Sequence, residues 1–379
     1  MGGPKVKRIV ITGAQGLIGW HAHARLHAAN CAAHFKGNPL PYQICALGHA
    51  EFEDDLALQA ALTASDAVLH FAGVNRAPDD VVGSANPAIA QRLKDACISV
   101  GAAPHIIYAN STHSASDTPY GISKRRAGEI VASHTSAFTD LVLPHIFGEA
   151  ARPNYNNVTA TLIAHILAGE TPSINPNGAV QLLHAGAAAQ IAIDAVMTGK
   201  FGRIVPTPRP ISVSDLFAVL KSFHDGYLAN IFPELSNPFV RDLFNSYRAA
   251  TYPSVWPRPL RMNTDARGTL FEAVKGGGGG QTFLSTTKQG VTRGDHFHLN
   301  KVERFLVVQG EAIIRIRKVL SDEVWEYRVS GEQPSPVDMP TLHTHSIENI
   351  GASDLLTLFW THDLFDPANP DTFADKVLR

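Results

Sequence analysis

The chain of 379 residues is 45% hydrophobic and 17% charged, and its formal net charge at pH 7 is -2. This length predicts two domains, and the absence of a Lys/Arg cluster argues against nucleic acid and favours a small metabolite as partner. Three widely spaced cysteines indicate free thiols in a reducing compartment rather than a disulfide framework. The start, Met1–Lys5, has no signal-peptide core, and no apolar run reaches membrane-spanning length, so we expect a cytoplasmic protein.

From Arg8 to about residue 200, apolar strand-like runs alternate with alanine-rich helical stretches. This alternation predicts a doubly wound parallel sheet of Rossmann type, covered by helices on both faces. The predicted strands are Ile9–Thr12, Gln43–Leu47, Ala67–Phe71, His105–Ala109 and Leu141–Leu143.

A glycine turn follows the first predicted strand. Gly13, Gly16 and Gly19 form the pattern G-x-x-G-x-x-G between that strand and a helix. Glycines let backbone amides approach a dinucleotide pyrophosphate, and the helix N-terminus offers N–H groups to its charge. The same glycines could simply make a tight turn, but their place on the first strand favours a cofactor site. Other residues expected to contribute to it are Gln15, Leu17, Ile18, Ala72 and Gly73.

The end of the second predicted strand leaves the choice of nicotinamide cofactor open. After Leu47 the chain reads Gly48, His49, Ala50, Glu51. There is no acid at the strand end to bind a ribose 2′-hydroxyl, and no arginine to meet a 2′-phosphate. His49 could contact either group.

A Tyr-x-x-x-Lys pair opens the helix after the fourth predicted strand. Tyr120 and Lys124 are four residues apart and share one helix face. We expect the Lys124 ammonium to lower the pKa of the Tyr120 phenol, so that Tyr120 passes a proton to a developing alkoxide near neutral pH. Ser111 could hydrogen-bond the same oxygen, with Thr112 as its nearest competitor. Such a pair alone is common on solvated helix faces, but its position after the glycine turn favours catalysis.

Together these motifs resemble the extended short-chain dehydrogenases/reductases that act on nucleotide-activated sugars, over about residues 5–245. The resemblance implies that the three glycines of the turn contact the pyrophosphate of NADP(H). It also implies that Tyr120 is the proton donor, that Lys124 binds the nicotinamide ribose and activates Tyr120, and that Ser111 binds the substrate carbonyl.

The middle of the chain changes character. Ser214–Phe223, with Ser214 as its cap, and Phe239–Tyr247 read as helices, and the prolines at 253, 257 and 259 suggest a linker. We therefore predict an NAD(P)-binding domain over residues 1–250 and a second domain over residues 251–379.

Short β-runs dominate after Arg261, around a five-glycine loop at Gly276–Gly280, and predict an all-β barrel or sandwich. They are Gln281–Thr286, Arg304–Val308, Ala312–Lys318, Glu323–Val329 and Leu355–Trp360.

A cluster of metal-ligand residues lies within this β-rich part. His296 and His298 are one residue apart, so in a strand they point to the same face. Glu303 follows a short turn, which predicts that the three side chains converge from a single hairpin. His345, inside P-x-L-x-x-H-x-x-x-N, would complete the site. Any one of these could be a surface histidine in a chain with 18 of them; all four in register indicate a metal site.

These two motifs resemble those of cupins, double-stranded β-helix barrels that hold a divalent metal with three histidines and one glutamate. The second motif normally reads P-x-G, and Leu342 replaces its glycine, so we expect a different turn before His345. We favour Zn²⁺ over another divalent metal, acting as a Lewis acid on an enolate or pinning the barrel. His343, Lys301 and His362 are candidate bases, and none stands out.

A reductase of this kind fused to a cupin resembles one family, the bifunctional capsular polysaccharide synthesis enzymes known as CapF. The likeness covers nearly the whole chain. Distinctive strings are Ala72–Arg76, Arg152–Asn157, Met262–Gly268, Gly290–His296, Lys301–Val308 and Phe365–Pro367. One departure is Leu143, where the family has arginine before the Pro-x-x-Phe-Gly turn.

The resemblance implies that the cupin inverts C3 of a UDP-2-acetamido-2,6-dideoxy-4-hexulose. The reductase then uses NADPH to reduce C4, giving UDP-2-acetamido-2,6-dideoxy-L-talose on the route to UDP-N-acetyl-L-fucosamine. It further implies that Asn75, Arg76, Asn154 and Asn156 line the sugar pocket. The C3 proton is acidified by the C4 ketone, so a base and a stabilised enolate suffice for inversion.

Two other readings stay open. One is a monofunctional nucleotide-sugar 4-ketoreductase or 4-epimerase whose cupin only dimerises. The other is a non-catalytic NADP-binding regulator with a cupin sensor. In each case we expect a homodimer through the C-terminal domain, because open sheet edges of cupin barrels often pair.

Overall fold

The computed structural model describes residues 6–379, and their packing defines two compact units. The N-terminal unit holds the chain up to Thr161 together with Asn177–Val213, and the C-terminal unit holds Leu162–Pro176 and Ser214–Arg379. The N-terminal segment Met1–Lys5, on which part of the localisation expectation rests, lies outside the described residues. The predicted functional boundary after residue 250 stays a prediction.

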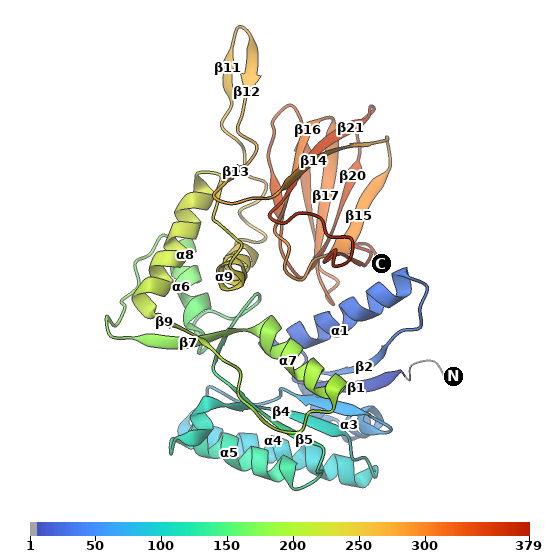
Figure 1. The fold of residues 1–379 in the computed structure, drawn as a ribbon, viewed down its shortest axis with the longest axis vertical. Helices are drawn as coiled ribbons and strands as arrows, with labels where there is room; N and C mark the ends of the chain where they lie inside the picture. The colour runs from blue at the N-terminus through green and yellow to red at the C-terminus, as the bar shows by residue number, and fades with distance from the viewer. Residues whose placement is uncertain (1–5) are drawn as a thin grey trace. The chain divides into compact units, whose positions relative to one another are not determined.

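The core of the N-terminal unit is a six-stranded parallel sheet of strand order β2-β1-β3-β4-β5-β8 (Figure 1). Its strands are β1 (Lys7–Thr12), β2 (Tyr42–Leu47), β3 (Ala67–His70), β4 (His105–Ser111), β5 (Phe138–Leu143) and β8 (Gly202–Ile204). All five predicted strands are present within two or three residues of their expected ends. The predicted Rossmann-type fold is therefore confirmed.

Helices cover both faces of this sheet because strand side chains alternate. Ile9 and Ile11 of β1 face a core shared with Ala22 and Ala188 of two helices, while Val10 faces the opposite core with Leu93. The first face is covered by α1 (Leu17–Phe35) and α7 (Ala185–Thr198). The second is covered by α2 (His49–Glu53), α3 (Asp55–Leu62), α4 (Asp79–Ser99) and α5 (Pro119–Ala132).

A small second sheet, not predicted, extends the N-terminal unit. It has strand order β6-β7-β9, from β6 (His145–Phe147), β7 (Ala179–His184) and β9 (Arg209–Ser212). Between β4 and α5 lies a short 3-10 turn, η1 (Thr112–Ala115). The segment Gly148–Asn157 leaves β6 before α6 (Val158–Leu167) begins.

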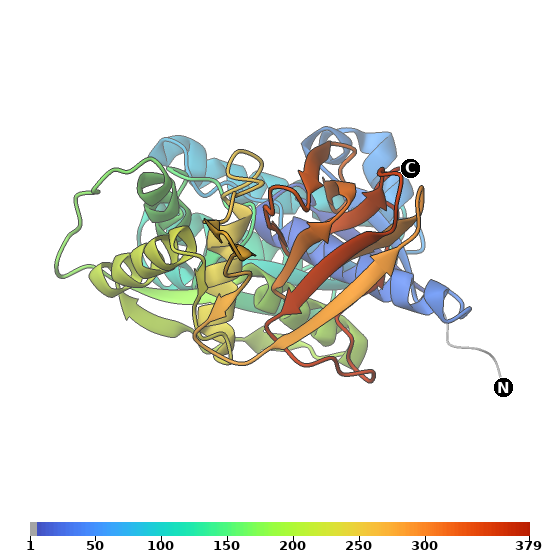
Figure 2. The same cartoon turned by 90° about the horizontal axis from the view of Figure 1, so that it is seen from above.

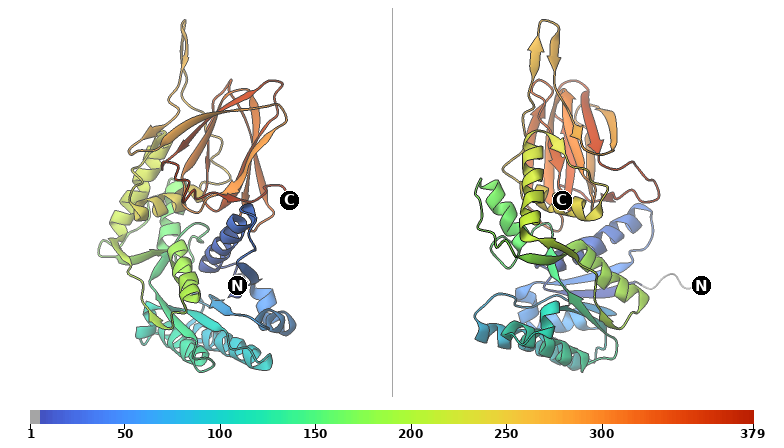
Figure 3. Two further views of the ribbon diagram at one scale, coloured as in Figure 1. Left: turned by 45° about the vertical axis from the view of Figure 1, so that its right-hand side comes forward. Right: turned by 60° about the vertical axis from the view of Figure 1, so that its left-hand side comes forward.

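The C-terminal unit contains a barrel of two antiparallel sheets, of orders β14-β21-β16-β19 and β18-β17-β20-β15-β22 (Figure 3). Its strands are β14 (Gln281–Thr287), β15 (Thr292–Phe297), β16 (Glu303–Gln309), β17 (Glu311–Lys318), β18 (Val324–Ser330), β19 (Val337–Met339), β20 (His343–Asn349), β21 (Leu355–Thr361) and β22 (Phe373–Ala374). The five predicted β-runs map onto β14, β16, β17, β18 and β21. The predicted cupin-like region is confirmed.

Short pairings outside the barrel complete the unit. Strands β11 (Asn263–Asp265) and β12 (Gly268–Leu270) form an exposed hairpin. Strand β10 (Ile231–Phe232) pairs in parallel with β13 (Lys275–Gly276) at the start of the glycine loop.

Two helices pack on the outer face of the first barrel sheet. They are α8 (Val213–Leu228), which begins one residue before the predicted cap, so Ser214 lies inside it, and α9 (Pro238–Ala249). On that face Arg304 of β16 donates to both carboxylate oxygens of Asp338 at 2.5 and 2.8 Å, and Tyr227 of α8 donates to the same carboxylate. This buried, fully paired group fixes α8 against the sheet.

The proline-rich segment after α9 is not a free linker. Arg258 N donates to Pro336 O and Leu260 N to Pro334 O, both at 3.3 Å, and the Tyr327 hydroxyl donates to Pro253 O at 3.1 Å. The segment therefore runs along the barrel, whose strands Figure 2 shows from above in orange to red. In the described part of the chain, no helix has the length and apolarity needed to cross a bilayer.

Candidate cofactor site and metal centre

The glycine turn has the tight geometry that its sequence predicts. Gly13 has a φ of +67°, and a Cβ on it would lie 2.7 Å from Ala72 N. A Cβ on Gly19 would lie 2.2 Å from Gly13 O, so the helix packs directly on the turn. Gly16 caps α1 without a side-chain hydrogen bond, which leaves the first helical amides for an anionic ligand. A cradle that side chains would fill therefore fits a dinucleotide pyrophosphate.

The loop after β3 is held against this turn by a residue that the sequence reading missed. Asn86, buried in α4, accepts from Val74 N and donates to Val74 O, each at 2.9 Å, and donates to Ser123 Oγ at 3.0 Å. A Cβ on Gly73 would lie 2.9 Å from Asn86 Oδ1. Asn86 thus holds the loop that contains Ala72 and Gly73, which the sequence predicts to contact the cofactor. Its only signal in the sequence is that a polar residue lies on a buried helix face.

His49 is exposed at the start of α2. The nearby Glu51 carboxylate accepts from Gly48 N at 2.9 Å, so it serves the helix start. Neither residue decides between NAD and NADP.

Ser111 and Tyr120 meet at the carboxyl end of the sheet. Ser111 is the last residue of β4 and is buried, whereas Thr112 is exposed, and it is Ser111 that forms a hydrogen bond with Tyr120. Tyr120 lies in the first turn of α5, which Thr118 caps by accepting from Gly121 N at 3.1 Å. Burial raises the pKa of Tyr120, and a hydrogen bond with Ser111 opposes that rise.

Lys124 is engaged differently from our expectation. Its ammonium donates to Ala109 O at 2.6 Å and lies 4.3 Å from the centre of the Tyr108 ring. Burial lowers the pKa of Lys124 to about 7, and the Asp140 carboxylate opposes that shift. The expected lowering of the Tyr120 pKa by Lys124 is therefore wrong for this structure, because burial of the phenol dominates and Lys124 is not among the groups that shift it.

Asn110 and Asp140, which were not predicted as site residues, form hydrogen bonds next to Ser111. Asn110 Nδ2 donates to Asp140 Oδ1 and Asn110 Oδ1 accepts from Ser111 N, both at 2.8 Å. A cavity of about 380 Å³ beside α5 is lined by both residues, but not by Ser111, Tyr120 or Lys124. The Ser111–Tyr120 pair, which the sequence predicts to be catalytic, therefore lies outside the lining of that cavity.

The four predicted sugar-pocket residues come together although they lie about eighty positions apart. Arg76 Nη1 donates to Asn154 O, and Asn156 Nδ2 donates to Asn75 O at 2.6 Å. Asn154 and Asn156 have φ values of +58° and +49°, a left-handed conformation that asparagine tolerates better than most residues. All four are exposed, as a substrate-contacting surface requires.

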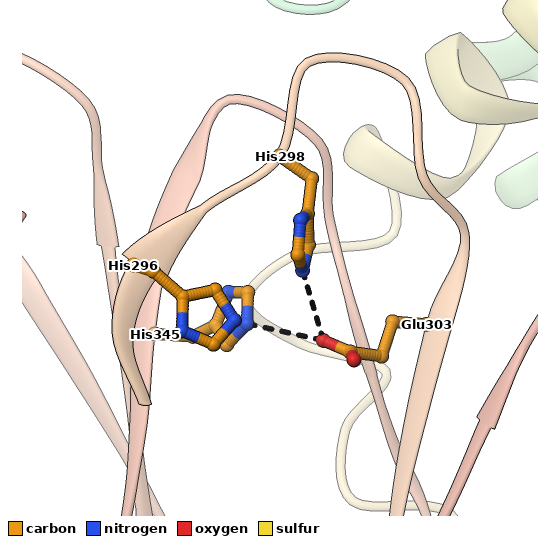
Figure 4. Close-up of side chains that lie close together, drawn as sticks. All are labelled: His296, His298, Glu303 and His345. Carbon is orange, nitrogen blue, oxygen red and sulfur yellow. Dashed lines mark hydrogen bonds and ion pairs between the residues drawn. The ribbon is translucent and has the colours of Figure 1, made fainter. Parts of the chain in front are cut away.

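The four predicted metal ligands converge inside the barrel (Figure 4). Their ligand atoms all lie within 4.8 Å of one another. Glu303 Oε2 is 3.0 Å from His298 Nε2 and 3.2 Å from His345 Nε2, and the His296 and His345 ring centres are 4.6 Å apart. The set is buried apart from half-buried His296.

We predicted that His296, His298 and Glu303 converge from a single hairpin, but the structure places them differently. His296 lies on β15 and His345 on β20, two paired strands of one sheet, whereas Glu303 begins β16 in the other sheet. His298 follows the end of β15. The site is thus formed across the barrel, and the predicted hairpin is wrong because β15 and β16 do not pair.

Two backbone features place the histidines. A bulge between Gly294 and His296 leaves Asp295 unpaired, with a φ of +55°, and sets His296 directly opposite His345. Leu342, which stands where the motif normally has glycine, adopts a left-handed conformation, with a φ of +59°. Its buried side chain and its N–H, which donates to His298 O at 2.8 Å, offset that strain. The backbone before His345 therefore takes a conformation that favours glycine, although leucine is present.

The charge state of the cluster suits a divalent metal. Burial lowers the pKa of His345 and, with the neighbouring imidazoles, holds the pKa of His296 well below its usual value, so both rings are neutral. Burial alone would raise the pKa of Glu303, but the adjacent His298 holds it well below the usual range. His345 Nε2 is buried, and its near partner is the Glu303 Oε2 atom that His298 Nε2 also faces. Three imidazoles that converge on one carboxylate fit zinc or a similar ion.

The three candidate bases are all occupied by other contacts. Lys301 Nζ donates to Pro370 O at 2.7 Å, and the His343 ring contacts Thr341 O through Nδ1 at 2.8 Å. His362 Nδ1 accepts from Val302 N at 3.1 Å. No base is assigned among them.

A second His/Glu group, not predicted, lies in the N-terminal unit. His184 Nε2 is 2.8 Å from Glu149 Oε2, and His21 Nε2 is 3.2 Å from Glu149 O. Residues of α1, of the turn after β6 and of β7 supply these side chains, which are buried. Burial lowers the pKa of His21 to about 3.

Comparison with known proteins supports the two-part architecture. The NAD dependent epimerase/dehydratase family model matches residues 9–198, and the polysaccharide biosynthesis C-terminal domain model matches residues 263–373. A UDP-2-acetamido-2,6-beta-L-arabino-hexul-4-ose reductase of Pseudomonas aeruginosa is 30% identical over 386 residues, covering 98% of this chain and 99% of the relative.

Two solved structures resemble the whole chain. The capsular polysaccharide assembling protein CapF from Staphylococcus aureus is 29% identical, with a TM-score of 0.55, covering 97% of this chain and 99% of the other. A structure of CapF with the inhibitor 3-isopropenyl-tropolone is 31% identical, with a TM-score of 0.52 and the same coverage.

Proposed function

The chain belongs to the CapF-like family, in which an NAD-dependent epimerase/dehydratase domain precedes a polysaccharide biosynthesis C-terminal domain, and we propose that it is a bifunctional nucleotide-sugar enzyme. Its reductase site reduces the C4 ketone of a UDP-2-acetamido-2,6-dideoxy-4-hexulose after the barrel has inverted C3. The product is UDP-2-acetamido-2,6-dideoxy-L-talose, a precursor of UDP-N-acetyl-L-fucosamine for capsule or O-antigen. We expect this chemistry in the cytoplasm.

The meeting of Ser111 and Tyr120 at the carboxyl end of the sheet, with buried Lys124 one turn further along α5, supports the reductase step. Bound NADPH supplies a hydride to C4. Ser111 donates a hydrogen bond to the ketone oxygen, and the Tyr120 hydroxyl gives that oxygen its proton as the C4 alcohol forms. Lys124, whose pKa burial lowers to about 7, is suited to return a proton towards Tyr120 near neutral pH.

The buried His296, His298, Glu303 and His345 cluster supports the isomerase step. A divalent metal, zinc by preference, would supply Lewis acidity to the C4 oxygen as C3 loses its proton. The chain's own part is to hold three imidazoles and one carboxylate in the barrel interior. The deciding experiment is NMR of the product made from the UDP-4-hexulose and NADPH, where a C4 alcohol with unchanged C3 configuration would contradict the bifunctional proposal.

A monofunctional reductase whose barrel only dimerises is the second candidate. It is favoured by the engagement of Lys301, His343 and His362 in other contacts. Incubation of the ketosugar in deuterated water without cofactor separates the two. Deuterium at C3 supports the isomerase, and its absence supports the monofunctional reading.

A non-catalytic regulator that binds NADP is tested at Tyr120. The conjunction of Tyr120 with buried Ser111 and Lys124 speaks for catalysis. Loss of NADPH consumption in Tyr120→Phe, with the cofactor still bound, excludes the regulator.

We also propose a homodimer through the C-terminal unit. Strand β14 lies at the edge of its sheet and exposes Phe283 by 40% and Leu284 by 61%. An unpaired edge with apolar side chains is a template for pairing with a second copy. Light scattering of the full chain tests this, and a monomer mass would reject it.

A further inference from the structure

The C-terminal strap, which we define as residues 370–377, is a segment near the C-terminus that packs against the barrel. Its short strand β22 pairs with β15, where Ala374 lies opposite His296 and Phe373 opposite Phe297. The strap therefore lies beside the strand that carries the first predicted metal ligand, although some 75 residues separate them in sequence.

Asp371 binds the loop that joins two of the ligands. Its carboxylate accepts from Leu299 N at 3.0 Å and from Asn300 N and Lys301 N, both at 2.8 Å. These residues span most of the chain between His298 and Glu303. A carboxylate that accepts three backbone N–H groups forms strong charge-assisted hydrogen bonds, so it holds the loop in one conformation.

The backbone of Asp371 acts on a ligand directly. His298 Nδ1 lies 2.5 Å from Asp371 O, and a carbonyl oxygen can only accept, so this nitrogen carries the proton. The nitrogen left for a cation is then Nε2, which faces Glu303 Oε2 at 3.0 Å and would exchange the proton it shares with that carboxylate for the cation. One residue thus sets both the tautomer of His298 and the loop that leads to Glu303.

The far end of the strap holds the other histidine-bearing strands. Asp375 Oδ2 accepts from Thr344 Oγ1 and from Arg317 Nη2, both at 2.7 Å, and Asp375 N donates to Asp295 O at 2.9 Å. Thr344 adjoins His345, and Asp295 adjoins His296. The strap thereby contacts every segment that supplies an imidazole to the cluster.

We propose that the C-terminal strap is an integral part of the metal centre and that Asp371 is its positioning residue, fixing the His298 tautomer and the ligand loop so that the four ligands stand ready for a divalent cation. This rests on the metal-binding half of the proposed function. Asp371 touches neither metal nor substrate and acts through His298 and the loop backbone.

The test is the Zn²⁺ affinity of the full chain, measured by competition with a chromophoric chelator. Asp371→Asn is nearly isosteric but cannot accept all three N–H groups, and we expect its affinity to fall by about 10- to 100-fold. Asp366→Asn is the matched control, since this exposed carboxylate makes only local contacts with Ala368 and Asn369 in the same tail. We expect it to bind like the parent chain.

The outcomes separate the inference from its premise. If the parent chain binds no zinc, or His345→Ala binds as well as the parent, the proposed metal site fails. If the parent binds zinc and Asp371→Asn binds within twofold of it, the strap inference is overturned.

Two spectroscopic readouts distinguish positioning from general stability. Co²⁺ bound to Asp371→Asn should show altered d–d bands, whereas Asp366→Asn should keep the parent spectrum. Should Asp371→Asn fail to fold, ¹⁵N-histidine NMR of the zinc-loaded parent decides the matter. A protonated Nδ1 on His298 supports the proposal, and an unprotonated Nδ1 refutes it.

Discussion

Two buried His/Glu groups occur in the described part of this chain, and they differ in how well their polar atoms are satisfied. In the N-terminal unit, Glu149 is paired with His184, and His21 has Glu149 O on one side and Arg25 at 3.5 Å on the other. In the barrel, three imidazoles surround one carboxylate, and the Nε2 atoms of His298 and His345 both face its Oε2, at 3.0 and 3.2 Å.

Residue type alone therefore does not define a metal site. The first group is closed by its own hydrogen bonds and needs no ion, so we interpret it as a structural link between α1 and the turn after β6. The barrel group instead brings two imidazole nitrogens to one oxygen of a single buried carboxylate, and burying poorly satisfied polar atoms is costly. Only the second group is therefore expected to bind a cation.

The largest expected effect is on metal content. His345→Ala should reduce bound zinc from about one ion per chain to none, because it removes a ligand from a four-ligand site. Glu149→Gln should leave the zinc content unchanged. Elemental analysis of the purified chains measures both. If zinc remained in His345→Ala but were lost in Glu149→Gln, the group in the N-terminal unit would be the metal site and not the barrel group.

The next effect separates the chemistry of the two units. Tyr120→Phe should lower NADPH-dependent reduction by about 10²- to 10⁴-fold, the usual contribution of a proton donor. Deuterium exchange at C3 should continue, because the barrel does not use Tyr120. Thr112→Val, at an exposed position, is the control for reduction. A parallel loss of exchange and reduction in Tyr120→Phe would argue for one shared site.

A smaller effect concerns stability. Glu149→Gln replaces the carboxylate that joins His21 and His184, and we expect a loss of about 1–3 kcal/mol in the free energy of unfolding. Chemical denaturation of the metal-free chain measures it. The exposed Glu170→Gln, whose partner His165 is also solvent-accessible, should change stability by less than about 1 kcal/mol. Equal losses in the two variants would contradict a closed internal network.

The smallest effect is a pH dependence of stability. Burial lowers the pKa of His21 to about 3, against an ordinary value of 6.5, with Glu149 opposing the shift and His184 and Arg25 adding to it. Between pH 3 and pH 6.5 the unfolded chain binds a proton on His21 that the folded chain does not bind. The free energy of unfolding therefore decreases as pH falls from 6.5 towards 3, and His21 causes no such loss above pH 6.5. His21→Gln should flatten the decline in melting temperature between pH 6.5 and 4. An unchanged slope would show that His21 does not titrate on unfolding.

Local patterns carried much of what could be predicted. The strands of the parallel sheet follow from their apolar runs, the glycine turn from its spacing, and the Ser111, Tyr120 and Lys124 set from its order in the chain. Each is a short-range property of backbone conformation, which adjacent residues largely determine. The four proposed barrel ligands were also predicted from spacing and do lie together, although their arrangement was not predicted.

The features that could not be predicted depend on contacts between segments that are distant in the sequence. The sequence by itself determined the two folds and predicted the candidate site residues, because periodicity and glycine turns are local. Only the tertiary structure decided that Glu303 faces the histidines from the opposite sheet, that burial governs the pKa values of Tyr120 and Lys124, and that Asp371 clasps the ligand loop. Their physical causes are hydrogen bonds and desolvation between residues that are far apart in the chain, and no spacing along the chain records them.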